Sequence, residues 1–496
     1  MSELPADGAS SAPHPGPGFG ARAARGFLWT MGAFGANRLL VFASTLVLAR
    51  LLAPEDFGIV AAGLTLVLYL EVALDLGLGA AVVYEQETGI SRRVQTAFTV
   101  TITVATALTV LGMVLAPLLA DFFRASNETT LFRAIFLSIL LRGAGQVPDA
   151  LLRRDLRFVA RSATDTARGV VRLGVTVSLA FAGAGPWAIV GGLLASDVTG
   201  TTLVWALTRF RPTFTLDRAA LKVLLGFGGS VVLLKVLDAV ATDIDYLVVG
   251  RILGLTALGH YTIAYRLPEL LLLNVFWVFS SVAFPIYAAV RSSKPRDFGG
   301  AVLHALRLVT LYSLPVAVGL ALLSRDTVLV LFGDKWAPAV LPMTLLALTA
   351  IPMSLGYASG DVFPAIGRPG LLLAFNVPMS AVLVVCLIAA APYGITAVAA
   401  AHLGVTTVYG IARVLLANRI VGTTLAGSVR AMRPGLAAAA GVLLVAGPVR
   451  LLADAGVGTL ALLGVAVVAG GALGLLLGGR DAVADLRALA RSAAHR

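Results

Sequence analysis

Apolar runs of about the length needed to cross a lipid bilayer follow one another along almost the whole chain. A membrane-spanning helix needs about 20 consecutive apolar residues. Short polar stretches, several of them with glycine or proline, separate the runs. We therefore predict an all-α integral membrane protein with fourteen transmembrane helices, at residues 27–48, 58–83, 95–120, 130–150, 162–183, 186–208, 222–249, 258–290, 299–323, 336–359, 369–391, 394–418, 432–453 and 457–479.

One polar turn occurs twice along the chain, at a constant offset of 201 residues. The first copy reads RLLAPEDFG (Arg50–Gly58) and the second reads RILGLTALG (Arg251–Gly259). An even number of spans lies between the copies, so both enter the membrane in the same direction, as parallel repeats related by a pseudo-twofold axis do. We therefore expect two six-helix lobes and two added helices, arranged as an N-lobe at 26–208, a cytoplasmic linker at 209–221, a C-lobe at 222–418 and two further spans within 419–479.

The first copy of the turn has residues suited to joining two membrane helices. Pro54 lacks an amide hydrogen, so it suits the first turn of the second span. Glu55 and Asp56 complement the positive end of that helix. Gly58 lets two backbones approach closely, and Arg50 is expected at the outer interface. We interpret the turn as a folding hairpin, with a direct part in gating as the alternative.

Both ends of the chain are expected in the cytoplasm. Residues 1–25 have the proline-, glycine- and serine-rich composition of a disordered tail. Arg22 and Arg25 precede the first apolar run, which fits a retained span better than a signal peptide because the run leads directly into the turn. Residues 480–496 form either an amphipathic helix on the cytoplasmic membrane surface or a solvated tail.

The composition excludes a large soluble enzyme. Hydrophobic residues make up 58% of the 496 residues and charged residues only 13%, whereas soluble domains carry about 25% charged residues. The single cysteine, Cys386, lies in an apolar run and is interpreted as a packing residue. One thiol leaves neither a disulfide within the chain nor a cysteine-based metal site.

The net charge of +12 reflects orientation in the membrane rather than binding of nucleic acid. With the N-terminus in the cytoplasm, 23 of the 38 lysines and arginines fall on the cytoplasmic side, six on the outer side and nine within spans. Cytoplasmic loops of membrane proteins are enriched in lysine and arginine. The pattern therefore predicts a multi-pass protein of the cytoplasmic membrane with both termini inside.

Three segments resemble one family of transporters. RLLAPEDFG followed by ALDLGLGAAVV (Ala73–Val83) resembles the start of the Wzx-type polysaccharide-repeat flippases, a branch of the multidrug/oligosaccharidyl-lipid/polysaccharide exporter superfamily. VVGRILGLTALGHYTIAYRL (Val248–Leu267) is similar to the second-half signature of that family. PDALLRRDLRF (Pro148–Phe158) is similar to the loop after span 4 in its O-antigen, colanic-acid and teichuronic-acid exporters. The resemblance extends over residues 25–420.

The resemblance implies a transporter that moves an undecaprenyl-diphosphate-linked oligosaccharide from the cytoplasmic to the outer leaflet. Its lobes would alternate between inward-open and outward-open states around a cationic cavity, while the lipid tail stays in the bilayer. The expected partners are the lipid-linked oligosaccharide and membrane lipids, with a polysaccharide polymerase and glycosyltransferases as further candidates. The protein is expected to be a monomer without cofactors.

Nine basic residues fall within predicted spans, where charged groups are costly and normally face a cavity or a partner. Arginine binds phosphate through planar, bidentate donors. Arg168 and Arg172 share one helix face, where an anion between them would relieve their repulsion. They are expected towards the cytoplasmic side at the level of Arg142, with Arg38 and Arg266 nearer the midplane. The predicted diphosphate site consists of Arg38, Arg142, Arg168, Arg172, Arg266 and Arg307.

Ordinary ion pairing is the alternative for these residues. Asp165 lies three and seven residues before Arg168 and Arg172, and Arg266 lies three before Glu269. Lys235 and Asp238 have the same spacing of three.

Two carboxylates, Glu71 and Asp75, lie four residues apart on one face of the second span. Neighbouring buried carboxylates favour uptake of a cation, so the pair is a candidate for coupling to protons or sodium. An ion pair between this face and Arg38 on the preceding span is the alternative.

The remaining motifs are weaker. Asp243 and Asp245 resemble the D-x-D of glycosyltransferases but fall in the outer half of a span, away from cytoplasmic sugar nucleotides. His304 and His402 are isolated and are interpreted as packing residues, although His304 lies three residues before Arg307 and is a candidate to line the cavity. None of the four lysines follows a glycine, so the chain has no G-K-[ST] phosphate-binding loop. An ion gradient or the membrane potential is therefore the expected energy source.

Two other functions compete with a flippase. A cation-coupled multidrug antiporter of the same superfamily would favour acidic residues in its cavity, whereas this chain has an excess of arginines within its spans. A membrane glycosyltransferase or polymerase would need a long outer loop with catalytic residues, and the predicted outer loops are short.

Overall fold

The computed structural model describes residue 35 and residues 38–74, 92–217 and 243–477. Helices account for most of these residues, and they contain no strand. Both predicted tails, the first part of span 1, most of span 7, and the charged residues Asp75, Lys235 and Asp238 lie outside the described residues.

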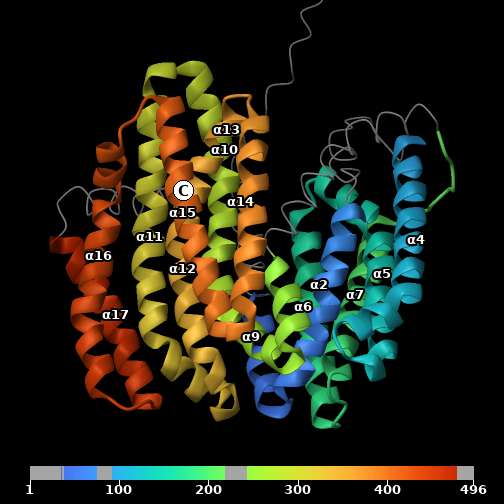
Figure 1. The fold of residues 1–496 in the computed structure, drawn as a ribbon. Helices are drawn as coiled ribbons and strands as arrows, with labels where there is room; N and C mark the ends of the chain where they lie inside the picture. Colours follow the sequence, from blue (N-terminus) through green and yellow to red (C-terminus); the bar gives the residue numbers. More distant parts are fainter. Residues whose placement is uncertain (1–34, 36–37, 75–91, 218–242, 478–496) are drawn as a thin grey trace, which may run out of the picture.

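Five long helices, with helical residues 38–51 before them, make up what we call the N-terminal helix group. Charged residues at their ends and long apolar stretches between them explain why each helix is long. In Figure 1 this group lies on the right. Its members are α2 (Pro54–Leu74), α4 (Arg92–Phe122), α5 (Thr129–Arg154), α6 (Phe158–Phe181) and α7 (Trp187–Thr208).

The C-terminal helix group begins with helical residues 243–253 and continues to α15. Two further helices, α16 (Leu425–Leu452) and α17 (Val457–Leu477), pack against each other and against α11 on the far side of this group (Figure 1). The group consists of α9 (Leu255–Pro268), the π-helical turn η2 (Glu269–Leu273), α10 (Asn274–Ser293), α11 (Phe298–Asp326), the π-helical turn η4 (Thr327–Phe332), the 3-10 turn η5 (Asp334–Ala339), α12 (Val340–Gly360), α13 (Val362–Ala365), α14 (Pro369–Ala390) and α15 (Ile395–Val421).

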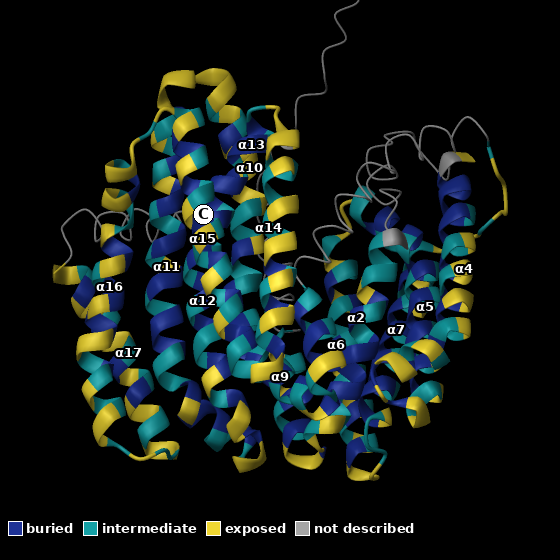
Figure 2. Cartoon of the chain, viewed as in Figure 1, coloured by how far each residue is buried: buried dark blue, intermediate teal, exposed yellow. Residues whose placement is uncertain are grey.

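Ten helical stretches of the described chain are long and apolar enough to cross a membrane. They correspond to ten of the fourteen predicted spans. The helix α6 is not among them, because every 18-residue stretch of it contains Asp165, Arg168 and Arg172. Exposed apolar side chains run along the outward faces of α4, α14 and α17 (Figure 2), as expected for surfaces that face lipid.

The first copy of the repeated turn starts α2 as the sequence predicts. Pro54 is the first residue of the helix. The Asp56 carboxylate accepts a hydrogen bond of 2.8 Å from the backbone N–H of Ala53. Asp56 therefore helps to cap the N-terminus of α2 from within its first turn. In the second copy Gly254, with a φ of 90°, precedes α9, and the absence of a Cβ makes this conformation inexpensive.

The two copies of the turn pack directly against each other. A methyl group added at Gly58 would lie 1.8 Å from the carbonyl oxygen of Leu255, and one added at Gly259 would lie 1.8 Å from the carbonyl oxygen of Pro54. The offset of 201 residues relates Pro54 to Leu255 and Gly58 to Gly259. One contact is therefore made twice, with the roles exchanged, as across a twofold axis.

Two arginines related by the same offset join the groups crosswise. The Nε of Arg50 donates to the carbonyl of Leu331 at 3.0 Å, and its Nη2 donates to the carbonyl of Val330. Arg251 donates to the carbonyl of Phe122 at 2.7 Å and lies 4.9 Å from the centre of that ring. Each arginine thus binds the end of a helix in the opposite group.

Lys335 and Trp336, in η5, add bonds at the same place. The Nζ of Lys335 donates to the carbonyl of Leu52 at 2.7 Å, and the Nε1 of Trp336 donates to that of Ala49 at 2.8 Å. We call this end of the molecule, where both turns lie, the turn end. The two helix groups are held together there.

Candidate functional site

Arg142, on α5, lies between two carboxylates of neighbouring helices. Its Nη1 is 2.7 Å from Glu71 on α2, and its Nε is 3.0 Å from Asp197 on α7. Arg142 thus forms ion pairs that join three helices. These ion pairs offset the free-energy cost of placing charged groups in apolar surroundings. The structure pairs Glu71 with Arg142, whereas the sequence suggested Arg38 as its alternative partner.

A second charged group joins the N-terminal and C-terminal helix groups. Glu269 is 3.8 Å from Arg38 and 3.5 Å from Arg266. The pair Arg266–Glu269 is one that the spacing of three residues predicted. Glu269 is the first residue of the π-helical turn η2, and π-helical turns inside α-helices occur frequently at functional sites.

Arg172, on α6, connects the two charged groups. Its charged neighbours are Arg266, Arg142, Asp197 and Arg38, in decreasing order of influence. The guanidinium makes no hydrogen bond or ion pair with another of the residues that the structure describes. Arg172 therefore lies within electrostatic reach of Arg38 and Arg266 as well as of Arg142.

Arg168 lies one turn of α6 from Arg172 and packs on a glycine. A methyl group at Gly200 of α7 would lie 1.5 Å from the Nε of Arg168. That Nε is buried and has no hydrogen-bond partner. Asp197 also feels the charge of Arg168, so both arginines of this helix face the same region.

We call this set the arginine cluster: Arg38, Arg142, Arg168, Arg172 and Arg266, with the carboxylates of Glu71, Asp197 and Glu269. Five cations face three anions among these described side chains, an excess of two positive charges. The side chains of Arg38 and Arg142 keep 38% and 32% of their surface exposed although they lie on helices of apolar composition. Charged groups in that position normally face a water-filled cavity or a partner, and the excess of positive charge in this cluster suits an anion.

Two further residues were predicted to belong to the site. Arg307 lies on α11 and is not among the charged neighbours of Arg172. Asp75 lies outside the described residues. Asp165 has Arg161, Asp149, Arg168 and Arg153 as charged neighbours, so it faces the loop after α5 as well as Arg168.

Asp197 is not among the site residues predicted from the sequence. It is the only charged residue of α7 and lies in the middle of that helix, which was the available signal. Its position opposite Arg142 depends on how α5 and α7 pack, and that packing is not encoded in local spacing.

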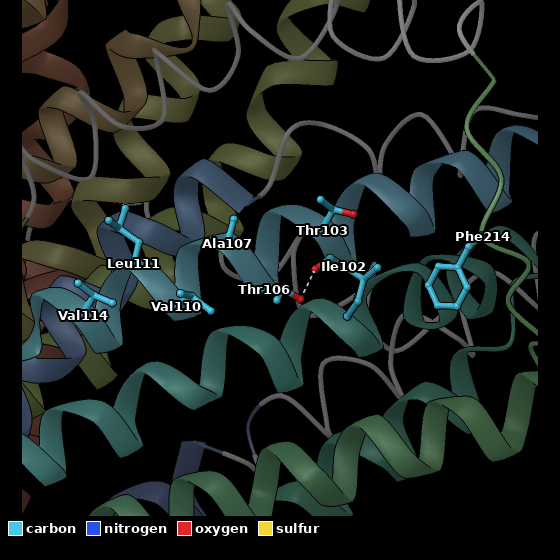
Figure 3. A pocket seen from close by; sticks show the side chains of 8 residues that line it. All are labelled: Ile102, Thr103, Thr106, Ala107, Val110, Leu111, Val114 and Phe214. Atoms are coloured by element: carbon cyan, nitrogen blue, oxygen red, sulfur yellow. Dashed lines mark hydrogen bonds between the residues drawn. The ribbon is translucent and has the colours of Figure 1, made fainter.

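A groove of about 780 Å³ lies on the outer face of α4, lined from Ile102 to Val114 and by Phe214 (Figure 3). The hydroxyls of Thr103 and Thr106 donate to carbonyls of their own helix at 2.7 Å, so they offer no free donor to a ligand. This groove is apolar and separate from the arginine cluster. No group of three or more His, Cys, Asp or Glu side chains within the described residues is arranged to hold a metal ion.

Sequence comparison connects the chain with polysaccharide biosynthesis. A family model described as polysaccharide biosynthesis protein matches residues 47–341. The chain is 26% identical to the teichuronic acid biosynthesis protein TuaB of Bacillus subtilis (strain 168), over 71% of this chain and 72% of that protein. It is 28% identical to the succinoglycan biosynthesis transport protein ExoT of Rhizobium meliloti (strain 1021), over 67% and 68% of the two chains.

Solved transporters share the fold. The lipid II flippase MurJ in an inward closed conformation superposes with a TM-score of 0.73 at 16% identity, covering 93% of this chain and 99% of that one. An inward-facing multidrug transporter of the MATE family superposes with a TM-score of 0.63 at 17% identity, covering 78% and 94%. The chain therefore belongs to the polysaccharide biosynthesis protein family as a multi-pass membrane protein, and it shares the fold of these transporters.

Proposed function

We propose that this protein moves an undecaprenyl-diphosphate-linked oligosaccharide from the cytoplasmic to the outer leaflet of the cytoplasmic membrane. The diphosphate binds the arginine cluster, and the lipid tail stays in the bilayer. The names of TuaB, ExoT and the flippase MurJ agree with a substrate of this class.

The observation that carries the proposal is Arg172. It lies near three other arginines and makes no ion pair with a carboxylate in the described part of the chain. A bound diphosphate would relieve the repulsion among these guanidinium groups and accept their hydrogen bonds. Hydrogen bonds between charged groups are about twice as strong as those between neutral groups. Removal of such a bond weakens binding by about 1.5–3 kcal/mol, which corresponds to a tenfold change or more.

The pairing of the carboxylates disfavours a multidrug antiporter. Glu71 and Asp197 are both bound to Arg142, and Glu269 is bound to Arg266. None of the three is left to hold an organic cation. The alternative of a cation-coupled antiporter therefore has no specific observation in its favour.

The transport cycle that we propose is alternating access between two lobes. The N-terminal and C-terminal helix groups are the cores of the lobes predicted at 26–208 and 222–418, with spans 13 and 14 at 419–479. The turn end faces outwards, because the excess of lysine and arginine falls on the opposite side. In this cycle the crosswise bonds of Arg50 and Arg251 would close the outer face, and the substrate would reach the arginine cluster from the cytoplasm.

A transport assay tests this function. Deletion of the gene should cause the lipid-linked oligosaccharide to accumulate in the inner leaflet, and that material can be extracted and reconstituted with purified protein in liposomes. We expect Arg172→Ala to reduce translocation at least tenfold, measured as glycan accessible to an enzyme added outside. Arg133→Ala is the matched control, because Arg133 is an exposed arginine of α5 outside the cluster, and it should keep the wild-type rate.

Two results would overturn the proposal. One is a deletion strain with unchanged surface polysaccharide and no accumulation of the lipid-linked unit. The other is a folded Arg172→Ala protein that transports at the wild-type rate, which would remove the diphosphate from the arginine cluster.

A further inference from the structure

One exposed face of α10 continues from the arginine cluster in the direction away from the turn end. Glu269 belongs to the cluster and is the first residue of the π-helical turn η2, which leads directly into α10. Two turns of an α-helix take about seven residues, and a π-helical turn adds one residue to them. Trp277, eight residues after Glu269, therefore returns to the face of that carboxylate, and Phe284, seven residues further on, shares it.

This face of α10 is directed towards the N-terminal helix group. Glu269 lies 3.8 Å from Arg38, which belongs to that group. A different face of α10 is buried in the C-terminal group, where Phe276 and Tyr287 are wholly covered. The hydroxyl of Tyr287 donates to the carbonyl of Ala358 in α12 at 3.0 Å. The helix is thus held from one side, and the face of Glu269 is left towards the space between the groups.

The indole of Trp277 is open to that space. It keeps 68% of its surface exposed, more than any other tryptophan that the structure describes. The indole N–H groups of Trp205 and Trp336 donate to backbone carbonyls at 2.9 and 2.8 Å. That of Trp277 has no hydrogen-bond partner among the described residues. Trp277 therefore presents a wide apolar ring with a free donor at its edge.

Trp277 lies too deep in the membrane to be an interfacial anchor. Tryptophan is enriched at the membrane–water interfaces, and Trp187, the first residue of α7, has such a position. Trp277 precedes Arg291, in the last turn of α10, by 14 residues, which corresponds to about 21 Å of helix. A free N–H at that depth is costly against lipid, whereas a water-filled space between the helix groups accommodates it.

We propose that Trp277 binds the sugars nearest the diphosphate of the lipid-linked substrate, while the arginine cluster holds the diphosphate itself. The C–H groups on the face of a pyranose ring pack against an aromatic ring, and the indole N–H donates to a sugar oxygen. Trp277 lies about 12 Å along the helix from Glu269, within reach of sugars attached directly to a diphosphate in the cluster. Phe284, which is 41% exposed, extends the same surface. The inference rests on the proposed function and names the part of the chain that receives the glycan.

Two lipids separate the sugar contact from the diphosphate contact. The probes are the lipid-linked oligosaccharide extracted from the deletion strain and undecaprenyl diphosphate, which has no sugar. Binding of each to the purified protein is measured by native mass spectrometry. We expect Trp277→Ala to weaken binding of the oligosaccharide lipid about tenfold, as removal of a stacked aromatic ring does in other complexes. Binding of undecaprenyl diphosphate should stay unchanged, and Trp277→Phe should restore most of the lost affinity because a flat ring is kept.

The controls come from the same helix and from the cluster. Val282 is 48% exposed on another face of α10, so Val282→Ala should leave the binding of both lipids unchanged. Arg172→Ala should weaken the binding of both lipids, because both contain the diphosphate. Equal weakening of both lipids by Trp277→Ala would overturn the proposal, since the sugar would then not be what the indole contacts.

Fluorescence quenching tests the surroundings of Trp277 without any substrate. The emission that is lost in Trp277→Phe belongs to Trp277. We expect iodide, which stays in water, to quench this emission in nanodiscs, and brominated lipids to leave it unchanged. Quenching by the brominated lipids, or by neither agent, would place the indole against the bilayer or within the protein and would overturn the proposal.

The sugar contact and the proposed function fail in different ways. A wild-type protein that binds neither lipid would reject both. A wild-type protein that binds the two lipids equally well, or a Trp277→Ala protein that binds the oligosaccharide lipid as tightly as the wild type, would reject the sugar contact and leave the flippase.

Discussion

Arg142 and Arg172 lie on neighbouring helices but differ in how their charges are balanced. Arg142 binds Glu71 and Asp197, whereas Arg172 has cations as its main neighbours. The first residue therefore contributes to folding as well as to the site, and the second is available to a ligand. A loss of transport is informative about binding only for Arg172.

Unfolding experiments should separate these roles. We expect Arg142→Ala to lower the free energy of unfolding by about 3–5 kcal/mol, because it leaves two carboxylates without their partner. Arg172→Ala should leave it unchanged or raise it, since the substitution removes repulsion. The measurement is denaturant unfolding in detergent, followed by circular dichroism.

A triple variant provides the control for the buried ion pairs. Arg142→Met with Glu71→Gln and Asp197→Asn removes all three charges together, and it should recover most of the stability lost in Arg142→Ala. If the single and triple variants are equally unstable, packing rather than charge explains the effect.

Local spacing predicted only part of this site. The pair Arg266–Glu269 and the shared face of Arg168 and Arg172 follow from positions three and four residues apart. The approach of Arg172 to Arg38 and Arg266 depends on contacts between helices far apart in the sequence, for which one sequence holds no periodic signal. The same holds for His402, which the sequence suggested to be a packing residue and which lies 3.4 Å from Asp245 in the structure.

At the scale of elements, the repeated turn is a contact surface as well as a hairpin. The sequence predicted that Pro54 begins a helix and that Gly58 permits close approach of a backbone. It did not indicate that the backbone at Gly58 would be that of the second copy. The helix expected over 258–290 is also divided, into α9, the π-helical turn η2 and α10, a change that places Glu269 beside Arg38 and has no marker in the apolar pattern.

Substitution of either glycine should weaken the closed turn end. A methyl group at Gly58 or Gly259 meets a backbone carbonyl, which a side-chain rotation cannot relieve, and overpacking of this kind costs about 1–3 kcal/mol. We expect Gly58→Ala and Gly259→Ala each to lower the melting temperature and to lengthen the distance between two spin labels at the turn end, attached through Asn127→Cys and Tyr393→Cys in a Cys386→Ser background.

Gly404→Ala is the matched control, because that glycine lies in α15 with open space around it. The double variant should cost less than the sum of the two single ones, since both contacts open together. Wild-type distances in both single variants would show that the helices adjust without separating.

At the scale of the whole molecule, the closed turn end depends on bonds that cross between the helix groups. Arg50 and Arg251 each donate to the end of a helix in the opposite group. Both bonds must break before the groups can separate at this end, whereas the apolar cores of the groups need not change.

Loss of these arginines should therefore shift the conformational balance. We expect Arg50→Gln with Arg251→Gln to populate a longer distance between the labels at positions 127 and 393 than the wild-type protein shows. The melting temperature of each helix group should change little. Arg124→Gln is the control, because Arg124 lies in the turn between α4 and η1 at the same end; an equal effect there would point to net charge rather than to the crosswise bonds.

The exchange of roles between Gly58 and Gly259 has a consequence for the history of the chain. An interface in which each half presents the same surface to the other is that of a symmetric dimer, now formed within one polypeptide. A half-length ancestor with this turn could already have paired with its own copy, so fusion of two genes would have added no new contact. Fusion permitted divergence of the two halves. The arginine cluster has most of its members in the first half, an asymmetry that two identical subunits cannot have.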